Sequence, residues 1–295
     1  TVSSARPVLV IHAGAGPRSP WRAEREPQMR AALLDAVERS RAVLERPGGA
    51  AIDAVQAAIQ YMEDECEFFN AGRGAALCSD GTVEMSASMM RGSDRAAGAA
   101  ALVRQTRQPI AAARAVLEHS EHVLIAGPAT DEFAARHGLE QRDRSYFVTD
   151  HQLDRLEQAG SDFERGTVGA VCLDADGSLI AGTSTGGRRG QLPGRVGDTP
   201  LIGAGTWADA RVAISCTGEG EAFIRTAAAH QVAVRLAAGA SLAQAATDTL
   251  QDIATLDGVG GLIAVGADGE VAMPFTTDVM NRAVWRAGAT PEAWV

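Results

Sequence analysis

The sequence predicts an α+β protein whose fold class is a four-layer αββα sandwich. Strand hairpins occur in both halves of the chain, and paired helices flank them. Strands and helices do not alternate regularly, so a doubly wound parallel sheet is the less favoured arrangement. The 295 residues can form either one large domain or two ordinary ones.

The first half of the chain contains a strand, two helices, a hairpin and two more helices. An apolar run from Val8 to His12 predicts a buried strand that ends in the glycine-rich turn HAGAG. Apolar residues three or four positions apart predict the helices, and Asp80-Gly81 predicts a hairpin turn. The expected elements are a strand at 8–12, helices at 28–46 and 51–63, strands at 83–89 and 98–103, and helices at 109–119 and 129–137.

The second half begins with the most strongly patterned strand in the chain, from Thr167 to Leu173. This strand follows a mostly polar stretch at about 142–166, which is the best candidate for a linker. The further expected elements are a strand at 179–185 after a turn at 174–177, a strand at 211–217, helices at 221–238 and 241–256, and strands at 261–265 and 270–275.

Composition excludes several classes of partner and of chemistry. The net charge of −10 and the mixing of Arg with acidic residues leave no basic field for nucleic acid. The chain contains no lysine, which excludes a phosphate-loop lysine, a Schiff-base lysine and a Ser-Lys nucleophile pair. No apolar run approaches the roughly 20 residues of a membrane span, and the start of the chain lacks the apolar core of a signal peptide. We therefore expect a cytoplasmic protein with no nucleic-acid partner and no membrane partner.

A threonine that starts a strand just after a glycine can become a nucleophile. If the bond between Gly166 and Thr167 is cut, Thr167 gains an α-amino group, whose reference pKa of about 7.7–8.0 makes it a base near neutral pH. The base then lies in the same residue as the hydroxyl that it deprotonates. Gly166 can adopt the unusual dihedral angles that attack on its own carbonyl requires. Gly-Thr also begins many ordinary strands, so the dipeptide alone is a weak signal.

The residues around this bond belong to a series of motifs. They are GTVGAV from Gly166, GTSTGG from Gly182, LPGRVGD from Leu192, SCTGEG from Ser215, HAGAG from His12, FNAGRG from Phe69 and GGLIAV from Gly260. Together these motifs resemble the plant-type (type III) L-asparaginase and isoaspartyl peptidase family of N-terminal nucleophile hydrolases, over nearly the whole chain.

The resemblance implies the N-terminal nucleophile hydrolase fold and self-cleavage between Gly166 and Thr167. The products are an α segment, 1–166, which includes the linker, and a β segment, 167–295, and together they form one αββα domain. The resemblance also implies a homodimer of matured αβ protomers and no required cofactor. A structural sodium ion is implied on the backbone carbonyls of Cys66, Phe69, Ala71 and Arg73.

The resemblance assigns roles around the new N-terminus. Thr167 is the nucleophile, and Thr185 is the neighbour that orients and tunes its amine. Thr217 and Gly218 form the oxyanion hole. Asn70 polarises the scissile carbonyl or positions water. On residue types alone, Thr185 is equally a strand-end turn residue, and SCTGEG is also a generic anion-binding turn, although the lack of lysine makes phosphate the weaker ligand.

The resemblance also implies a binding site for a zwitterionic substrate. Arg195 binds the α-carboxylate of an aspartyl group, Asp198 binds its α-ammonium group, and Gly220 offers a backbone carbonyl to the same ammonium group. By itself, R-V-G-D is more often a surface ion pair. Arg188 and Arg189 would disfavour cationic leaving groups if they face the site, but the sequence does not orient them.

Within one motif, two positions depart from the family pattern, because Ser86 and Arg91 stand where relatives usually have acidic residues. These departures leave local hydrogen bonding, dimer contacts and substrate preference open. The expected reaction is hydrolysis of a small aspartyl amide or β-aspartyl dipeptide, including L-asparagine, through a covalent β-aspartyl ester on Thr167. The alternatives are a glycosylasparaginase-like hydrolase, although those relatives usually carry Asp before the threonine, and a glycine-rich anion-binding protein that never matures.

Overall fold

The structure is a computed structural model that describes residues 6–157 and 165–295. Within these ranges it is a mixed α+β fold with two β-sheets, one of eight strands and one of four. The strands of the larger sheet are β1 (Val8–Gly16), β2 (Met85–Arg91), β3 (Ala97–Val103), β4 (Leu124–Ala126), β5 (Arg165–Leu173), β6 (Leu179–Thr185), β11 (Val279–Arg286) and β12 (Glu292–Trp294). The strands of the smaller sheet are β7 (Thr206–Ala208), β8 (Val212–Gly218), β9 (Gly260–Gly266) and β10 (Val271–Ala272).

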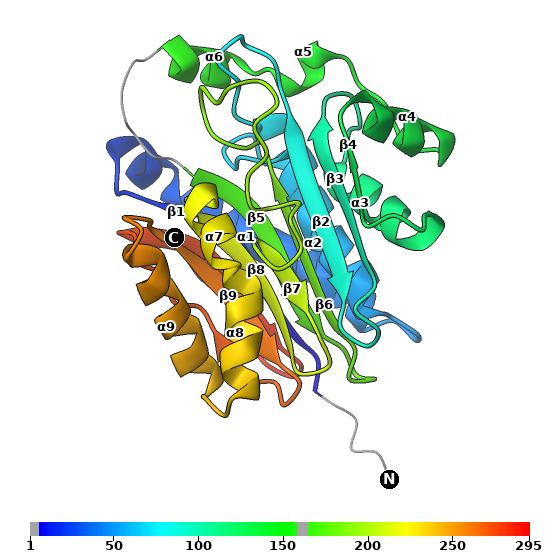
Figure 1. Ribbon diagram of the computed structural model, residues 1–295, viewed down its shortest axis with the longest axis vertical. Helices are drawn as coiled ribbons and strands as arrows, with labels where there is room; N and C mark the ends of the chain where they lie inside the picture. The colour runs from blue at the N-terminus through cyan, green and yellow to red at the C-terminus, as the bar shows by residue number, and fades with distance from the viewer. Residues whose placement is uncertain (1–5, 158–164) are drawn as a thin grey trace.

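The larger sheet mixes strands from both halves of the chain. Its strand order is β12-β11-β1-β5-β6-β2-β3-β4. Strands β5 and β6 come from the second half, yet they lie between β1 and β2 from the first half (Figure 1). Both strands pair antiparallel with their neighbours. The start of β5, which carries Thr167, therefore lies within the sheet and not at its edge.

Helices pack against each sheet. Helices α1 and α2 contact β1, β5 and β6, helix α3 contacts β2 and β3, and helices α8 and α9 contact β8 and β9 (Figure 1). The helices are α1 (Pro20–Leu44), α2 (Ala51–Glu65), the 3-10 helix η1 (Gly72–Gly74), α3 (Pro109–His119), α4 (Pro128–Arg136), α5 (Arg144–Phe147), α6 (Asp150–Glu157), α7 (Gly220–Thr226), α8 (Ala228–Ala237) and α9 (Leu242–Ala254).

Apolar side chains fill the space on both faces of the larger sheet. Along β1, Leu9 and Ile11 join a core cluster with residues of α1 and α2. The alternate residues Val8 and Val10 join a cluster with Ile263 and other residues of the smaller sheet. Side chains alternate between the two faces of a strand, so a strand that is buried on both faces is apolar at nearly every position. This explains the continuous apolar run at the start of the chain.

Several expected elements are confirmed, and the first strand and helix are longer than expected. Helix α3 and strand β6 have the expected ends. Strand β1 continues through HAGAG to Gly16, so the expected turn there is wrong, because β5 and β11 pair with these residues on either side. Helix α1 begins at Pro20 because the Ser19 side chain caps it by accepting a hydrogen bond from the Arg22 N–H.

The C-terminal third differs more from expectation. The helix expected at 221–238 is two helices, α7 and α8, because Ala227 adopts a left-handed conformation with φ of 49°. The last expected strand shortens to β10. Strands β11 and β12 were not expected, since Asn281 and Arg282 interrupt the apolar pattern of β11. Strand β11 nevertheless pairs with β1 in the larger sheet.

The polar stretch expected as a linker is partly helical. Helices α5 and α6 lie within it. Gln152 of α6 is buried, and its Nε2 donates to the Gly74 carbonyl at 2.6 Å. Residues 158–164 of the expected linker lie outside the described residues. None of the helices that the structure describes is long and apolar enough to cross a membrane.

Candidate active site

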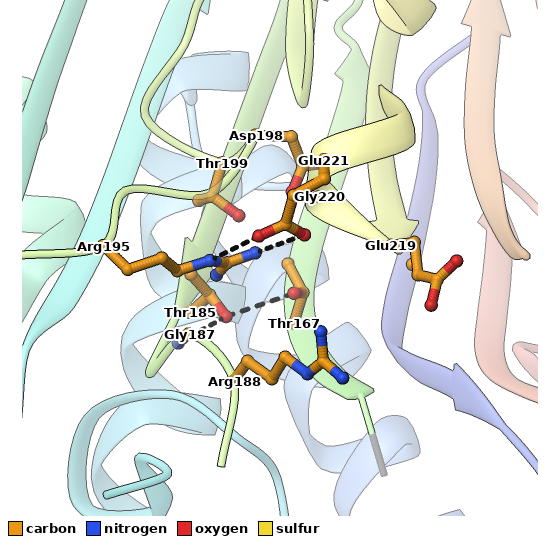
Figure 2. Close-up of a pocket in the computed structure, with 11 residues that line it drawn as sticks. Thr167, Thr185, Gly187, Arg188, Arg195, Asp198, Thr199, Glu219, Gly220 and Glu221 are labelled. Atoms are coloured by element: carbon orange, nitrogen blue, oxygen red, sulfur yellow. Dashed lines mark hydrogen bonds and ion pairs between the residues drawn. The ribbon is translucent and has the colours of Figure 1, made fainter. Parts of the chain in front are cut away.

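A pocket at the start of β5 brings together most of the expected site residues. Its walls are Thr167, Thr185, Gly187, Arg188, Arg195, Asp198, Thr199, Gly218, Glu219, Gly220 and Glu221 (Figure 2). Thr167 is buried, and its hydroxyl donates to Thr185 Oγ1 at 3.1 Å. The Gly187 N–H donates to the same Thr185 oxygen at 3.0 Å. Strands β5 and β6 are neighbours with Val168 opposite Ser184, and this pairing places the two threonines side by side.

The Gly166 carbonyl, which precedes Thr167, accepts a hydrogen bond from the first half of the chain. The Asn70 backbone N–H donates to it at 3.1 Å, and the Asn70 carbonyl accepts from the Gly186 N–H at 2.9 Å. A Cβ atom on Gly166 would lie 2.6 Å from Asn70 Cβ, so a larger residue does not fit without movement. The loop around Asn70 therefore holds the bond that is expected to break.

The Asn70 side chain does not line the pocket. Its Oδ1 accepts from the Ala76 N–H at 2.7 Å, and its Nδ2 donates to the Gly187 carbonyl at 2.6 Å. The amide thus ties its own loop to the turn after Thr185. Asn70 was expected to polarise the scissile carbonyl or to position water. The contact of Asn70 with the Gly166 carbonyl is made by its backbone N–H and not by its side chain.

The two expected oxyanion-hole residues lie at the end of β8. Gly218 lines the pocket, whereas Thr217 is fully buried and is not one of its lining residues. Among the described residues, no atom makes a hydrogen bond with Thr217 Oγ1. A Cβ atom on Gly218 would lie 2.5 Å from the Val259 carbonyl oxygen, so the close approach of the neighbouring chain requires glycine here.

Arg195 forms an ion pair that the sequence did not indicate. Its Nε and Nη2 atoms donate to the two carboxylate oxygens of Glu221, each at 3.0 Å (Figure 2). Its Nη1 donates to Gln191 Oε1 at 3.3 Å. The ion pair with Glu221 fixes the plane of the guanidinium group. Glu221 follows Gly220 directly, and its partner is far away in sequence, so only the fold brings the two together.

Asp198 is buried beside Arg195 without a complete set of partners. Burial raises the pKa of Asp198 to about 6, although the positive charge of Arg195 opposes the shift. Within the described part of the chain, no donor reaches its Oδ2 atom. A Cβ atom on Gly220 would lie 3.0 Å from Asp198 Oδ1 and 2.8 Å from Arg195 Nη2, so Gly220 leaves room for both charged groups. The pocket therefore offers a cation and an anion side by side.

A cluster of neutral polar side chains between the two sheets was missed in the sequence. His12 Nε2 lies 2.9 Å from Ser215 Oγ, which lies 2.7 Å from Thr183 Oγ1. Thr206 Oγ1 is 2.5 Å from Thr183 Oγ1 and 2.8 Å from Ser88 Oγ. Burial lowers the pKa of His12 to about 3. His12 is therefore uncharged at neutral pH.

A buried carboxyl group near the site was also missed. Glu63 of α2 accepts hydrogen bonds at Oε1 from Ser184 Oγ at 2.5 Å and from the Ile110 N–H at 3.0 Å. Its Oε2 has no partner among the residues that the structure describes. Burial raises the pKa of Glu63 to about 8, so the group is mostly protonated at neutral pH. A polar residue at an otherwise apolar helix position was the available signal.

The loop expected to hold sodium curls tightly on itself. The Cys66 carbonyl accepts from the Phe69 N–H at 2.9 Å, and the Phe69 carbonyl accepts from the Ala71 N–H at 2.9 Å. The Ala71 carbonyl accepts from the Gly74 N–H at 3.0 Å. A carbonyl oxygen has two lone pairs, so these bonds leave one free for a cation. The oxygen donors suit a hard ion. Among the described residues, no three His, Cys, Asp or Glu side chains gather to hold a metal.

The two departures from the family pattern differ in their distance from the site. Ser86 is buried on β2 and lies opposite Thr185 in the sheet. Arg91 makes an ion pair with Asp94, in which Arg91 Nη2 lies 2.7 Å from Asp94 Oδ2. Neither Arg91 nor Asp94 lines the pocket. The position of Ser86 next to Thr185 makes it the departure closer to the chemistry.

The chain is similar to known proteins over nearly its whole length. A family described as asparaginase matches residues 5–295. The isoaspartyl peptidase of Escherichia coli (strain K12) is 42% identical over 304 residues, with 96% of this chain and 94% of that protein covered. The isoaspartyl peptidase of Salmonella typhimurium is also 42% identical, with 96% of each chain covered. The isoaspartyl peptidase/L-asparaginase of Bos taurus is 37% identical, with 96% of this chain and 94% of that protein covered.

Proposed function

The chain belongs to the asparaginase family, and from this premise we propose that it is a self-processing threonine hydrolase of β-aspartyl dipeptides and L-asparagine. The observation that carries the proposal is the pocket in which Thr167 Oγ1 lies 3.1 Å from Thr185 Oγ1, beside Arg195 and Asp198. A nucleophile, a group that orients it, and two opposite charges for a zwitterion thus share one cavity.

The first reaction is cleavage of the chain itself. Thr167 Oγ attacks the carbonyl carbon of Gly166, the C–N bond breaks, and the proton of the hydroxyl passes to the released nitrogen. Water then hydrolyses the resulting ester, which leaves a carboxylate on Gly166 and a free amine on Thr167. The Asn70 N–H, 3.1 Å from the Gly166 oxygen, supports this step because it can stabilise negative charge on that oxygen.

The free amine of Thr167 then serves as the base for hydrolysis of substrates. His12, with a pKa of about 3, is too weak a base for this role, and the chain has no lysine to take it. Thr185 Oγ1 accepts from the Thr167 hydroxyl in the unbroken chain. In the cleaved chain the same oxygen can accept from the new ammonium group and adjust its pKa.

Substrate hydrolysis proceeds through an ester on Thr167. The amine takes the proton of the hydroxyl, Oγ attacks the β-carbonyl carbon, and the leaving amine departs with that proton. Water then attacks the β-aspartyl ester and releases aspartate. Thr217 and Gly218 are the proposed oxyanion donors, and the lack of a partner for Thr217 Oγ1 among the described residues supports this role.

The substrate is held through its α-carboxylate and α-ammonium groups. We propose Arg195 for the carboxylate, Asp198 for the ammonium, and the Gly220 carbonyl as a further acceptor for the ammonium. The unpartnered Oδ2 of Asp198 supports this assignment, because a buried carboxylate without a donor gains most from a cationic ligand. Glu221 holds the guanidinium group of Arg195 in position.

We propose the remaining family properties for this chain as well. They are the four-layer αββα sandwich, the division into an α segment (1–166) and a β segment (167–295) of one domain, a homodimer of matured protomers, a cytoplasmic location, and a structural sodium ion on the carbonyls of Cys66, Phe69, Ala71 and Arg73. The first is supported by the helices that pack on both sheets. Sedimentation of the matured protein tests the dimer, and melting in sodium against choline salts tests the ion.

Mass spectrometry of the purified protein tests the proposed function. The wild-type chain is expected to yield a fragment with the mass of residues 167–295, and the Thr167→Ala variant is expected to remain whole. Matured wild-type protein is expected to hydrolyse β-aspartyl-alanine and L-asparagine, and the variant neither. These assays are run on the same samples, so cleavage and hydrolysis are compared directly.

Three outcomes would contradict the proposal. A wild-type chain that stays whole after long incubation would favour an anion-binding protein that never matures. Hydrolysis by Thr167→Ala would remove the threonine from the mechanism. Activity on a glycosylated asparagine with none on β-aspartyl-alanine would favour a glycosylasparaginase.

A further inference from the structure

We propose that Arg188 binds the free α-carboxylate of the leaving amino acid at the mouth of the pocket. The inference rests on the proposed function and specifies its substrate class. It assigns this pocket to β-aspartyl dipeptides with a free C-terminal carboxylate, in preference to L-asparagine, whose leaving group is ammonia. The sequence left the orientation of Arg188 and Arg189 open, and the structure distinguishes the two.

Arg188 lines the same pocket as the nucleophile, and Arg189 does not. Figure 2 shows Arg188 on one side of Thr167, with the ion pair of Arg195 and Glu221 on the other side. Arg188 is exposed, as suits a residue at the mouth of a pocket. The nucleophile therefore lies between two cationic side chains.

The backbone turn that carries Arg188 is fixed by hydrogen bonds. Gly187 has φ of 79°, a conformation that favours glycine, and its carbonyl accepts from Asn70 Nδ2 at 2.6 Å. The Arg188 N–H donates to Gln191 Oε1 at 2.8 Å. The same Gln191 oxygen accepts from Arg195 Nη1 at 3.3 Å. One glutamine side chain thus links the turn of Arg188 to the guanidinium group of Arg195.

The direction of a bound substrate follows from these positions. When Arg195 and Asp198 hold the aspartyl end and the β-carbonyl lies at Thr167, the leaving group points away from the clamp. In a β-aspartyl dipeptide, the leaving nitrogen is two bonds from a second carboxylate carbon. A long, flexible arginine at the mouth can reach this group and bind it through two hydrogen bonds.

The charges of the pocket require a second cation for such a substrate. Arg195 already has Glu221 as a partner and also takes the aspartyl α-carboxylate in the proposed function. Of the two other acidic lining residues, Asp198 takes the ammonium group in the proposed function, and Glu219 points away from Thr167 in Figure 2. A second carboxylate near Thr167 therefore finds its complementary charge at Arg188. L-Asparagine has no group for this position.

Two matched substrates test the inference on matured full-length enzyme. They are β-aspartyl-alanine and β-aspartyl-alaninamide, which differ in the charge of the C-terminal group. Alaninamide is the less basic leaving amine, so chemistry alone favours the amide. We expect the wild type to prefer the acid by about tenfold in kcat/KM, through a lower KM, as for one charge-assisted contact. The preference is expected to shrink as salt is added.

The Arg188→Gln variant is expected to lose this preference, and the matched control Arg189→Gln is expected to keep it. Each kcat is normalised to the amount of cleaved chain, because a change at Arg188 also alters the neighbourhood of the cleavage site. Equal wild-type use of the acid and the amide would overturn the inference without any variant. A preference that survives Arg188→Gln would also overturn it.

If matured wild type hydrolyses L-asparagine but no β-aspartyl dipeptide, the subsite is wrong and the threonine mechanism stands. If it hydrolyses neither, the proposed function fails.

Discussion

The parts of the chain before and after the Gly166–Thr167 bond contribute to the pocket in different ways. All the described residues that line it lie after Gly166. The first part supplies groups that contact residues close to the lining residues in the sequence or in the sheets. The Asn70 N–H holds the Gly166 carbonyl, Glu63 accepts from Ser184, and His12 contacts Ser215. The reactive groups and their support are thus encoded in separate halves of the sequence.

The comparison also separates charged groups from neutral ones. Arg195, Asp198 and Glu221 of the second part carry charges into the pocket. The titratable supports of the first part are buried and uncharged at neutral pH, because burial raises the pKa of Glu63 to about 8 and lowers that of His12 to about 3. Changes in the first part should therefore affect cleavage and stability, and changes in the second part should affect substrate affinity.

The largest effect is expected where the two parts meet. Gly166→Ala places a Cβ atom 2.6 Å from Asn70 Cβ and 2.8 Å from Asn70 N, the atom whose N–H holds the Gly166 carbonyl. Loss of that donor is expected to slow self-cleavage by about a thousandfold, as for loss of one oxyanion-hole donor. The fraction of cut chain over time on a denaturing gel measures it. Gly239→Ala, at a glycine with φ of 99° and open space around it, controls for ordinary glycine strain and should cleave normally.

The second prediction concerns stability and belongs to the first part alone. The folded pKa of Glu63 is raised, so the wild type loses stability as pH rises from about 4.5 to about 8. Glu63→Gln removes this loss and is expected to raise the free energy of unfolding at pH 8 by about 4 kcal/mol, with little change near pH 4. Denaturant unfolding of uncleaved protein, in a Thr167→Ala background, measures the difference. Glu65→Gln on the same helix is exposed and should change stability little at either pH. A gain that is equal at both pH values would contradict the role of ionisation.

The third prediction concerns substrate affinity and belongs to the second part. Burial raises the pKa of Asp198 to about 6, so this carboxylate is lost as pH falls through 6. KM for L-asparagine is therefore expected to rise about tenfold per pH unit below 6, whereas kcat follows the amine of Thr167. Asp198→Asn should show a high KM that does not rise further below pH 6. A wild-type KM that stays constant from pH 7 to 4.5 would show that Asp198 does not bind the ammonium group.

The smallest effect is expected at Glu221. Its carboxylate is more than half exposed, and such ion pairs contribute little energy. Glu221→Gln weakens the bidentate contact that orients Arg195, and is expected to raise KM about fivefold with kcat and self-cleavage nearly unchanged. Steady-state kinetics measure both constants. A lower KM would mean that Glu221 competes with the substrate carboxylate and does not orient its partner.

The local sequence pattern predicted much of the fold, and the motifs identified the main candidate site residues. Helix α3 and strand β6 have the expected ends because their apolar periodicity is regular and proline or glycine punctuates their flanks. The break at Ala227 and strand β11 escaped prediction, because tertiary packing decides both against the local pattern. The motifs located Thr167, Thr185 and Arg195, but their roles remain proposals.

The supporting contacts could not be predicted, because each joins distant residues through the fold. Glu221 meets Arg195 across 26 positions, Glu63 meets Ser184 across 121, and His12 meets Ser215 across 203. Nothing in the local sequence of a glutamate or a histidine tells which distant hydroxyl or guanidinium will face it. The same limit applied to Arg188, whose direction became visible only in the folded chain.

The order of strands in the larger sheet has a consequence for the lifetime of the matured protein. Strands β5 and β6 lie between β1 and β2, so neither product of cleavage contains the whole of the larger sheet. The proposed cut turns one chain into two that remain interlocked in the native state but separate once unfolded. Before cleavage, folding of the single chain is a first-order process. After cleavage, refolding requires two fragments to associate, so it is second order and its yield depends on concentration. The matured protein would thus depend on the slowness of its first unfolding event more than on any ability to refold.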